Sequence, residues 1–276
     1  MIKTLIDIFN DLVAVFTQSE IIYRTIGSVI LLGLLIAFSL LNKLKLEKAF
    51  ITGFIRGFIQ IALMGSVLIF LFSLENIFVL YMVLLLMCLF AALSSKKILD
   101  NKMIVFIDFL SITIGSLGII SFVILLKIIP QPVQGEFVIP LGSMVISNAM
   151  VMNQIYSERL FSEIRKSQGF IEAALSLGDS PSHAVSGYMK QAIRAALVPT
   201  TKRMATLGIV TIPGLMSGMI VGGINPIEAA VYQVIIFLMI LCSAFISILI
   251  CGFFSLQFFF NSRDQLRMEI YLKKTD

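Results

Sequence analysis

Residues 227–256 read IEAAVYQVIIFLMILCSAFISILICGFFSL, a long apolar stretch whose only charged side chain is Glu228. The hydrocarbon core of a bilayer is about 30 Å thick, and a helix needs roughly 20 apolar residues to cross it. Backbone polar groups in lipid must be paired within their own segment, and a helix meets that demand. The stretch therefore predicts a membrane-spanning helix. Asn225 and Pro226 before it supply an N-cap and a proline at the first helical position.

Six further segments share this character. The seven candidate spans lie near residues 21–41, 50–73, 76–93, 103–129, 138–156, 204–222 and 227–256. Of the 276 residues, 58% are hydrophobic and 13% charged, and the mean hydropathy of +1.00 excludes a soluble domain of this length. We expect one all-α, polytopic membrane domain over residues 1–276, placed as a multi-pass protein in a bacterial cell membrane.

Positive charge alternates between the connections of the predicted spans. Seventeen of the 21 Lys and Arg residues lie in alternate connections and in the C-terminal tail. They are Lys43, Lys45, Lys48, Lys96, Lys97, Lys102, Arg159, Arg165, Lys166, Lys190, Arg194, Lys202, Arg203, Arg263, Arg267, Lys273 and Lys274. Cytoplasmic loops carry the excess of Lys and Arg, so we expect the N-terminus outside and the C-terminus in the cytoplasm. This distribution follows membrane topology and does not indicate a nucleic-acid partner.

The first 20 residues form a separate feature. Apolar residues there alternate with Lys3, Asp7, Asn10 and Asp11 at helical spacing, which predicts an amphipathic helix on the outer interface. A segment packed against the bundle would show the same pattern. No cleavage site follows a short apolar core, so we expect no removable signal peptide.

The longest polar segment, residues 158–203, lies between two predicted spans. Its helical periodicity stops at Gly178-Asp179-Ser180-Pro181, which indicates a helix end, an N-cap and a second helix over about 181–198. We therefore predict a helical elbow on the cytoplasmic side. The first helix ends in Glu172-Ala173-Ala174-Leu175-Ser176-Leu177-Gly178.

Enzymatic motifs do not occur in the chain. It has no phosphate-binding loop, nucleophile elbow or zinc-binding helix signature, and its single histidine, His183, has no second imidazole to share a metal. Cys88, Cys242 and Cys251 all fall in apolar segments and indicate small core residues. We expect a protein that is not an enzyme and holds no cofactor.

The elbow resembles the EAA loop by which ABC importer permeases dock on their ATPase. Glu172-Ala173-Ala174 and Gly178 match the first half of that loop, whereas the Ile-x-Leu-Pro of the second half has only a later counterpart in Ala196-Leu197-Val198-Pro199. The resemblance assigns ATPase coupling to Glu172, Ala173, Ala174, Gly178, Asp179 and Pro181.

Four motifs extend the resemblance to a particular family. They are EAALSLG at 172–178, IRAALVPT at 193–200, IPGLMSG at 212–218 and NPIEAAVYQ at 225–233. With them the chain resembles the FetB-like ABC transporter permeases, which include bacterial iron-export permeases and plant aluminium-tolerance relatives. It departs from that pattern at Met219, where the family has Gln, and at Asn225, where it has Asp. These departures weaken any cation-binding role for the two positions.

The resemblance implies a permease that exports metal, with iron the first candidate, and that pairs with a separate ATPase. ABC permeases need two membrane halves, so a homodimer is expected. Breaks and polar groups inside spans then indicate the pathway. The candidates are Asn148, Met152, Pro213, Gly214, Met216, Ser217 and Gly218, with Pro213-Gly214 placed in the middle of the sixth span. That break fits a hinge and a small-residue packing site equally well.

Other polar groups within predicted spans are Arg56, Gln60, Asp108 and Asn153. Arg56 and Asp108 lie near the cytoplasmic ends of their spans, where a side chain can reach water. No set of metal ligands can be assigned. Two alternatives remain: an ABC permease for another small solute, and a non-transporting membrane scaffold or signalling protein whose loop recruits a cytoplasmic partner.

Overall fold

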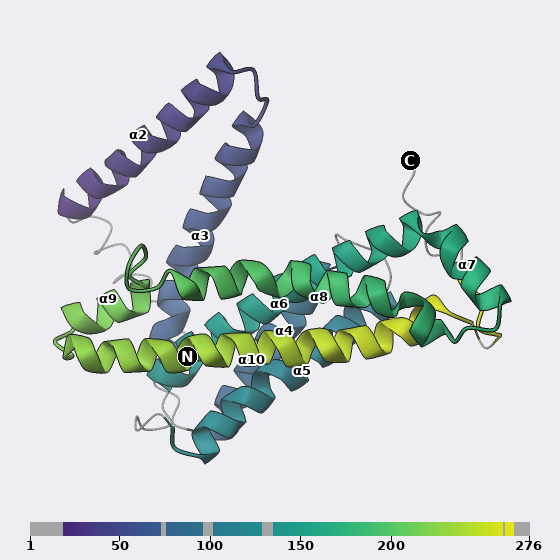
Figure 1. The fold of residues 1–276 in the computed structure, drawn as a ribbon. Coiled ribbons are helices and arrows are strands. Elements are labelled where there is room, and N and C mark those ends of the chain that lie inside the picture. The colour runs from purple at the N-terminus through teal and green to yellow at the C-terminus, as the bar shows by residue number, and fades with distance from the viewer. Residues whose placement is uncertain (1–18, 73–75, 96–101, 129–134, 262, 268–276) are drawn as a thin grey trace. The chain divides into compact units, whose positions relative to one another are not determined.

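The computed structural model describes residues 19–72, 76–95, 102–128, 135–261 and 263–267 (Figure 1). These residues form helices joined by turns, with two isolated β-bridges, which confirms the all-α prediction for this part of the chain. They divide into two compact units, Met1–Leu74 and Glu75–Asp276. The amphipathic helix expected over residues 1–20 lies almost wholly outside the described residues and stays a prediction.

The first unit is a hairpin of two apolar helices, α2 (Ser19–Leu41) and α3 (Glu47–Phe72). Ser39 stabilises the turn between them: its hydroxyl donates to the Glu47 carboxylate at 3.0 Å and accepts the Leu46 backbone N–H at 3.2 Å. Most of the described side chains of both helices are exposed, including large apolar ones. Such surfaces suit a lipid environment, where apolar exposure carries no hydrophobic penalty.

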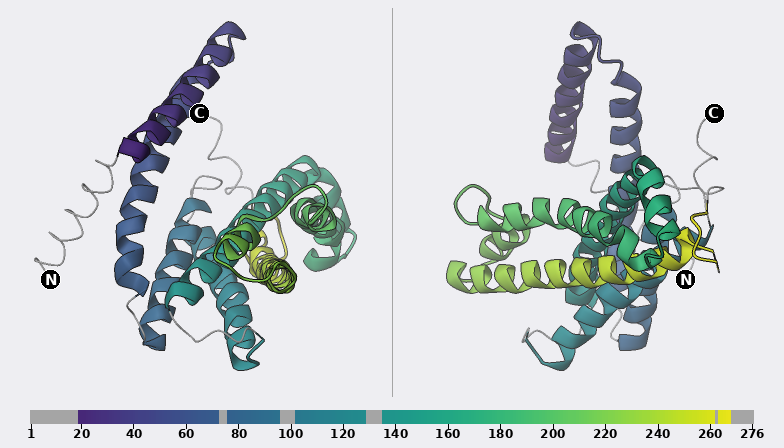
Figure 2. Two further views of the ribbon diagram at one scale, coloured as in Figure 1. Left: turned by 90° about the vertical axis from the view of Figure 1, so that its left-hand side faces the viewer. Right: turned by 45° about the vertical axis from the view of Figure 1, so that its right-hand side comes forward.

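The second unit is a helical bundle. Its elements are α4 (Ile77–Ser94), α5 (Lys102–Leu125), α6 (Gly135–Lys166), α7 (Gln168–Ser176), α8 (Pro181–Ala205), α9 (Gly214–Val221) and α10 (Pro226–Phe259). Helix α10 packs against α5 and α6, while α4 packs on α5 and α6. After the short α7, helix α8 runs back alongside α6 and α10 (Figure 2).

Two helices of this bundle are longer than the bilayer is thick. At 1.5 Å per residue, α6 with 32 residues and α10 with 34 extend about 50 Å, against a hydrocarbon core of about 30 Å. The last turns of α6 are polar, and Arg159 pairs with Glu163 at 3.0 Å on its surface. From this polarity we expect these turns to lie outside the hydrocarbon core, and they carry α7 at their end.

Five of the predicted spans form helices of membrane-crossing length and apolarity. They are Glu47–Gly65, Ile77–Ser94, Lys102–Leu125, Gly135–Lys166 and Pro226–Leu256, found among the described residues. The segment predicted at 21–41 also forms a helix, α2, whose apolar part within the described residues is Ile26–Leu41.

The span predicted at 204–222 is wrong. Helix α8 ends at Ala205, a turn with a β-bridge between Leu207 and Thr211 follows, and α9 begins only at Gly214. Gly208 adopts a positive φ of 79° in the turn, and Pro213 disfavours helical backbone at the residue before it. With eight residues, α9 is about 12 Å long and too short to cross a bilayer.

The elbow boundaries also differ from those predicted. Helix α6 does not stop near 156 but continues to Lys166, and α8 does not stop near 198 but continues through Pro199 to Ala205. The outer surface of these turns is polar and has the hydropathy of a loop. Their inner faces are buried, with Ile164 at 0% and Thr200 at 2% exposure, and this packing holds the turns in the bundle.

Helices α5 and α10 approach closely at Gly115. A Cβ atom added there would lie 2.7 Å from the Ser243 carbonyl oxygen and 3.0 Å from the Ser247 backbone nitrogen. Both neighbours are backbone atoms, so a larger residue forces the helices apart. Small residues allow this packing, which replaces the hydrophobic effect as the source of helix association in lipid.

We expect Gly115→Ala to lower the stability of the bundle. Overpacking of this kind costs about 1–3 kcal/mol, which would lower the midpoint of thermal unfolding in detergent. Gly118→Ala in the same helix is the matched control, because a Cβ there meets nothing within 4 Å. Its midpoint should stay equal or rise, since alanine favours helix by about 1 kcal/mol. Equal midpoints for the two variants would contradict the close approach.

Candidate functional sites at the elbow and in the bundle

The elbow between α7 and α8 is closed by hydrogen bonds typical of a helix end. Asp179 N–H donates to Ala174 C=O at 3.1 Å and Gly178 N–H to Leu175 C=O at 3.0 Å, which together form a Schellman motif. Gly178 takes the left-handed conformation that the motif requires, with φ of 92°. The helix end predicted at Gly178 is confirmed.

Helix α8 begins as its sequence indicates. Ser180 is the N-cap, its hydroxyl accepts the His183 backbone N–H, and Pro181 occupies the first turn. The Asp179 carboxylate accepts the Ser180 backbone N–H at 2.9 Å and lies 2.8 Å from His183 Nδ1. Both side chains of this pair reach the surface, and the hydrogen bond from His183 holds the pKa of Asp179 below its usual range.

We expect His183→Ala to raise the pKa of Asp179 towards its ordinary value. A depressed carboxyl pKa stabilises the folded elbow above the unfolded-state pKa, and this contribution is lost as pH falls through the folded-state value. The variant elbow should therefore lose less stability on acidification than the wild type. Carboxyl NMR titration of the purified protein measures the shift, and Ser186→Ala one turn further on serves as control. An unchanged Asp179 pKa would show that the pair does not form.

The outward face of α7 exposes large apolar side chains. Phe170 is 79% exposed and Leu177 89% exposed, and Ala173 between them is exposed as well. Their spacing of three and four residues places all three on one helix face. The opposite face is anchored by Ile171, which is 1% exposed. We call Phe170, Ala173 and Leu177 the elbow face.

The predicted coupling residues surround this face. Glu172 is exposed, and its carboxylate accepts a hydrogen bond from the Gln168 amide at 3.0 Å. Ala174 is half-buried, so of the two alanines only Ala173 is available to a partner. Gly178 is exposed, whereas Asp179 and Pro181 are half-buried beside the start of α8.

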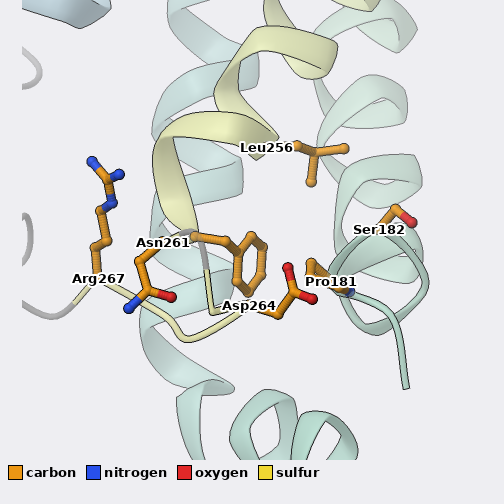
Figure 3. A pocket seen from close by; sticks show the side chains of 7 residues that line it. Pro181, Ser182, Leu256, Asn261, Asp264 and Arg267 are labelled. Atoms are coloured by element: carbon orange, nitrogen blue, oxygen red, sulfur yellow. The ribbon is translucent and has the colours of Figure 1, made fainter. Parts of the chain in front are cut away.

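An open hollow of about 450 Å³ lies next to Pro181 (Figure 3). It is lined by Pro181 and Ser182 of α8, by Leu256 of α10, and by Phe260, Asn261, Asp264 and Arg267 of the turn that follows α10. Asn261 shapes this turn, because its side-chain oxygen accepts the backbone N–H groups of Arg263 and Gln265, each at 2.9 Å. The hollow and the elbow face lie at the same end of the bundle.

A second candidate site lies inside the bundle. Helix α10 places four small polar side chains on one face at intervals of four residues: Ser243, Ser247, Cys251 and Ser255, all buried. We call them, with their polar neighbours on α5 and α6, the polar seam. Ser243 and Ser116 of α5 lie 3.1 Å apart between their hydroxyl oxygens, and the Cys251 thiol donates to the Asp108 carboxylate of α5 at 3.5 Å.

Helix α6 completes the seam. The Ser157 hydroxyl lies 3.8 Å from Cys251 Sγ. Asn153, one turn earlier on the same face of α6, is 0% exposed, and neither atom of its carboxamide has a hydrogen-bond partner among the described residues. Buried polar groups are usually paired, so this amide is an exception that demands a reason.

The predicted pathway residues divide between two places. On α6, Met152 is buried and its sulfur accepts the Thr200 hydroxyl of α8 at 3.6 Å, while Asn148 donates to the Met144 carbonyl of its own helix. The second set, Pro213, Gly214, Met216, Ser217 and Gly218, lies on α9 and at its N-terminus, and α9 packs against α10.

The sequence predicted that Pro213-Gly214 would lie in the middle of a long helix. In the structure these residues instead start the short helix α9. Pro213 is the N-cap of α9, and its carbonyl accepts the Ser217 hydroxyl at 3.2 Å. The mid-span hinge is therefore wrong in its position.

Sequence reasoning missed the polar seam and the elbow face. Asp108 was expected near enough to its helix end to reach water, but it is 1% exposed. Cys88 and Cys251 are buried core residues as predicted, whereas the prediction is wrong for Cys242, which is exposed. Cys251 also contacts that carboxylate. The signals were present: small polar residues recur every fourth position from 243 to 255, and two large apolar residues flank Ala173 on the face opposite Ile171.

Long apolar helices that enclose a buried polar seam define a polytopic membrane protein. Residues 22–260 match the uncharacterised protein family UPF0014, and the chain belongs to this family. It is a multi-pass protein of the cell membrane. No solved structure matches the chain significantly.

Relatives with given names lie in bacteria and plants. The chain is 34% identical to the probable iron export permease protein FetB of Escherichia coli, over 84% of this chain and 90% of the relative. It is 30% identical to the UPF0014 membrane protein YjkA of Bacillus subtilis, over 87% and 96%. It is 27% identical to protein ALUMINUM SENSITIVE 3 of Arabidopsis thaliana, over 96% and 97%. The resemblance found in the sequence is thus confirmed.

Proposed function

We propose that this protein is the membrane subunit of an ABC transporter, which exports metal ions when a separate ATPase binds the α7–α8 elbow. The observation that carries the proposal is the elbow face, where Phe170 and Leu177 stand exposed on a short, well-anchored helix. In this proposal the elbow lies in the cytoplasm and ATP is hydrolysed in the partner alone.

The elbow face has the chemistry of a docking surface. Its apolar residues lie beyond the polar last turns of α6, so in this proposal they stand outside the hydrocarbon core. Burying a Leu or Phe side chain is worth about 1.5–3 kcal/mol, which makes both residues candidate anchors for a partner. Ala173 between them lets a partner approach the helix closely. Glu172 and Asp179 form the polar rim, and Pro181 borders the hollow.

A packed core links the elbow to the membrane-spanning part. One continuous cluster of buried residues contains Ile171 of α7, Val185 of α8, Tyr156 of α6, and Ile107 and Cys251 of the spans. Packed cores move as units because they are dense, so displacement of α7 by a partner shifts the ends of α6, α8 and α10. This is the route by which we propose that ATP hydrolysis alters the pathway.

Metal export is proposed from the relatives. One of them is named a probable iron export permease, which makes Fe²⁺ the first candidate cargo. We propose that two copies of the chain form the transporter, since a pathway between membrane halves needs both. Asn148, Met152 and the α9 residues Pro213, Gly214, Met216, Ser217 and Gly218 remain proposed pathway residues.

The ATPase assignment is tested by co-purification. The permease is expressed with an ABC ATPase of its own genome, and the purified complex is assayed for ATP hydrolysis. We expect a stable complex whose hydrolysis rate exceeds that of the ATPase alone. A permease that is folded and inserted but binds no ABC ATPase would remove the basis for the docking assignment and favour a scaffold role.

A further inference from the structure

Asp108 is a carboxylate buried inside the bundle. It lies in the membrane-spanning helix α5 and is 1% exposed. Among the described residues no Lys, Arg or His forms an ion pair with it; its oxygen accepts the weak thiol donor of Cys251 at 3.5 Å. Ionisable side chains within membrane spans are rare, and they mark ion pathways more often than structural sites.

Polar atoms from three helices gather around the Cys251 thiol, which contacts this carboxylate. Cys251 Sγ of α10 lies 3.5 Å from Asp108 Oδ1, 3.8 Å from the Ser157 hydroxyl of α6 and 3.8 Å from the Ser255 hydroxyl. Asn153 lies one turn from Ser157, wholly buried and with both amide atoms unpartnered among the described residues. The contacting group therefore consists of one carboxylate, one thiol and the hydroxyls of Ser157 and Ser255, with the unpaired amide of Asn153 one helical turn from Ser157.

We propose that Asp108 and Cys251, completed by Ser157 and Asn153, bind the divalent transition metal that the protein exports. This inference rests on the proposed function. Thiolate and carboxylate together favour first-row transition metals over Mg²⁺ and Ca²⁺, which prefer oxygen alone. Cys251 binds as thiolate, so its proton is released to water when the metal enters, and the metal keeps its oxidation state.

The small number of charged ligands suits a transported metal ion rather than a permanently bound structural one. No group of three or more His, Cys, Asp or Glu side chains gathers anywhere in the described part of the chain. Structural metal sites typically use four Cys or His ligands. A site with two charged ligands and neutral oxygens holds a divalent ion less firmly than such a site. A transported ion must leave again, so moderate affinity is what such a site needs.

The site lies where the elbow can act on it. Cys251 is about two turns from the end of α10 at Phe259, on the side of the elbow. Cys251 and Ile107, the neighbour of Asp108, belong to the same buried cluster as Ile171 of α7. A shift of α7 therefore reaches both charged ligands through packed side chains, which gives the docked ATPase a means to change metal affinity.

Cobalt titration of the full-length permease tests the site without ATP or a partner. A Co²⁺ ion bound by thiolate gives a charge-transfer band in the near ultraviolet. We expect a saturable band in the wild type, with proton release, and no band in Cys251→Ser. Cys88→Ser and Cys242→Ser are matched controls that should retain it, since these thiols lie elsewhere on α4 and α10. Asp108→Asn should weaken Co²⁺ binding about tenfold or more.

Folding of each variant is checked by gel filtration and thermal unfolding. If Asp108→Asn proves unstable, Cys251→Ser, which replaces a single sulfur atom by oxygen, still tests the site. A wild-type protein without the band, or a band that survives in Cys251→Ser, would overturn the site. A wild type that exports metal yet shows no band would reject this site and leave the proposed function standing. Thiolate binding of Co²⁺ that depends on Cys251 would support the site even in a protein that moves no metal.

Discussion

Replacing Phe170 and Leu177 together by alanine should weaken binding of the ATPase by about 100-fold or more. Each side chain is almost fully exposed in the free permease, and each is worth about 1.5–3 kcal/mol once buried against a partner. The double variant should fold normally, because neither residue belongs to the buried core. Titration of the purified ATPase against permease in nanodiscs measures the dissociation constant.

The matched control for this experiment is Phe78→Ala. Phe78 is 80% exposed and lies in the first turn of α4. The opposite end of α4, at Ser94, is the end that contacts Met150 of α6. We expect unchanged ATPase binding in the control. Equal affinities for the wild type and the Phe170/Leu177 double variant would show that the elbow face does not contact the ATPase.

Gly178→Val should abolish stimulation of the ATPase while the protein still inserts into the membrane. Gly178 has a φ of 92°, and a β-branched residue in such a conformation is strained by about 1–3 kcal/mol. Nothing lies within 4 Å of an added Cβ, so the strain comes from the backbone alone. The turn should rearrange, and the elbow face should lose its fixed position relative to α8.

Gly178→Asn separates backbone strain from side-chain size. Asparagine adopts left-handed backbone far more readily than valine, so this variant should keep most of the stimulation. The readouts are the ATP hydrolysis rate of the complex and the membrane fraction of the permease. Full stimulation by Gly178→Val would remove the elbow turn from the coupling mechanism.

Local signals predicted the elbow well because they act over a few residues. Gly178, Ser180 and Pro181 each demand a particular backbone conformation, and the structure places a helix end, an N-cap and a helix start at those positions. Five apolar segments likewise became long helices, since lipid leaves an apolar chain few other options. The helix boundaries were less predictable, because the outer turns of α6 and α8 are polar on one face and buried on the other.

The polar seam depends on tertiary contacts that periodicity cannot locate. Asp108 and Cys251 are far apart in the chain, and the packing of α5 along α10, which is closest at Gly115, brings them together. The break at Pro213 was visible in the sequence, but hydropathy alone suggested a continuous span through it. Because residues 204–222 form no continuous span, the seven-span count is not confirmed, and the orientation of the termini remains a prediction.

Metal transport by the reconstituted complex tests the central claim most directly. The permease and its ATPase are placed in liposomes, and ATP-dependent movement of Fe²⁺, Mn²⁺, Zn²⁺ and Cu⁺ is measured. We predict movement of Fe²⁺ away from the face that carries the elbow and the ATPase, and none when a non-hydrolysable nucleotide replaces ATP. A complex that hydrolyses ATP and moves none of the four ions would contradict metal export.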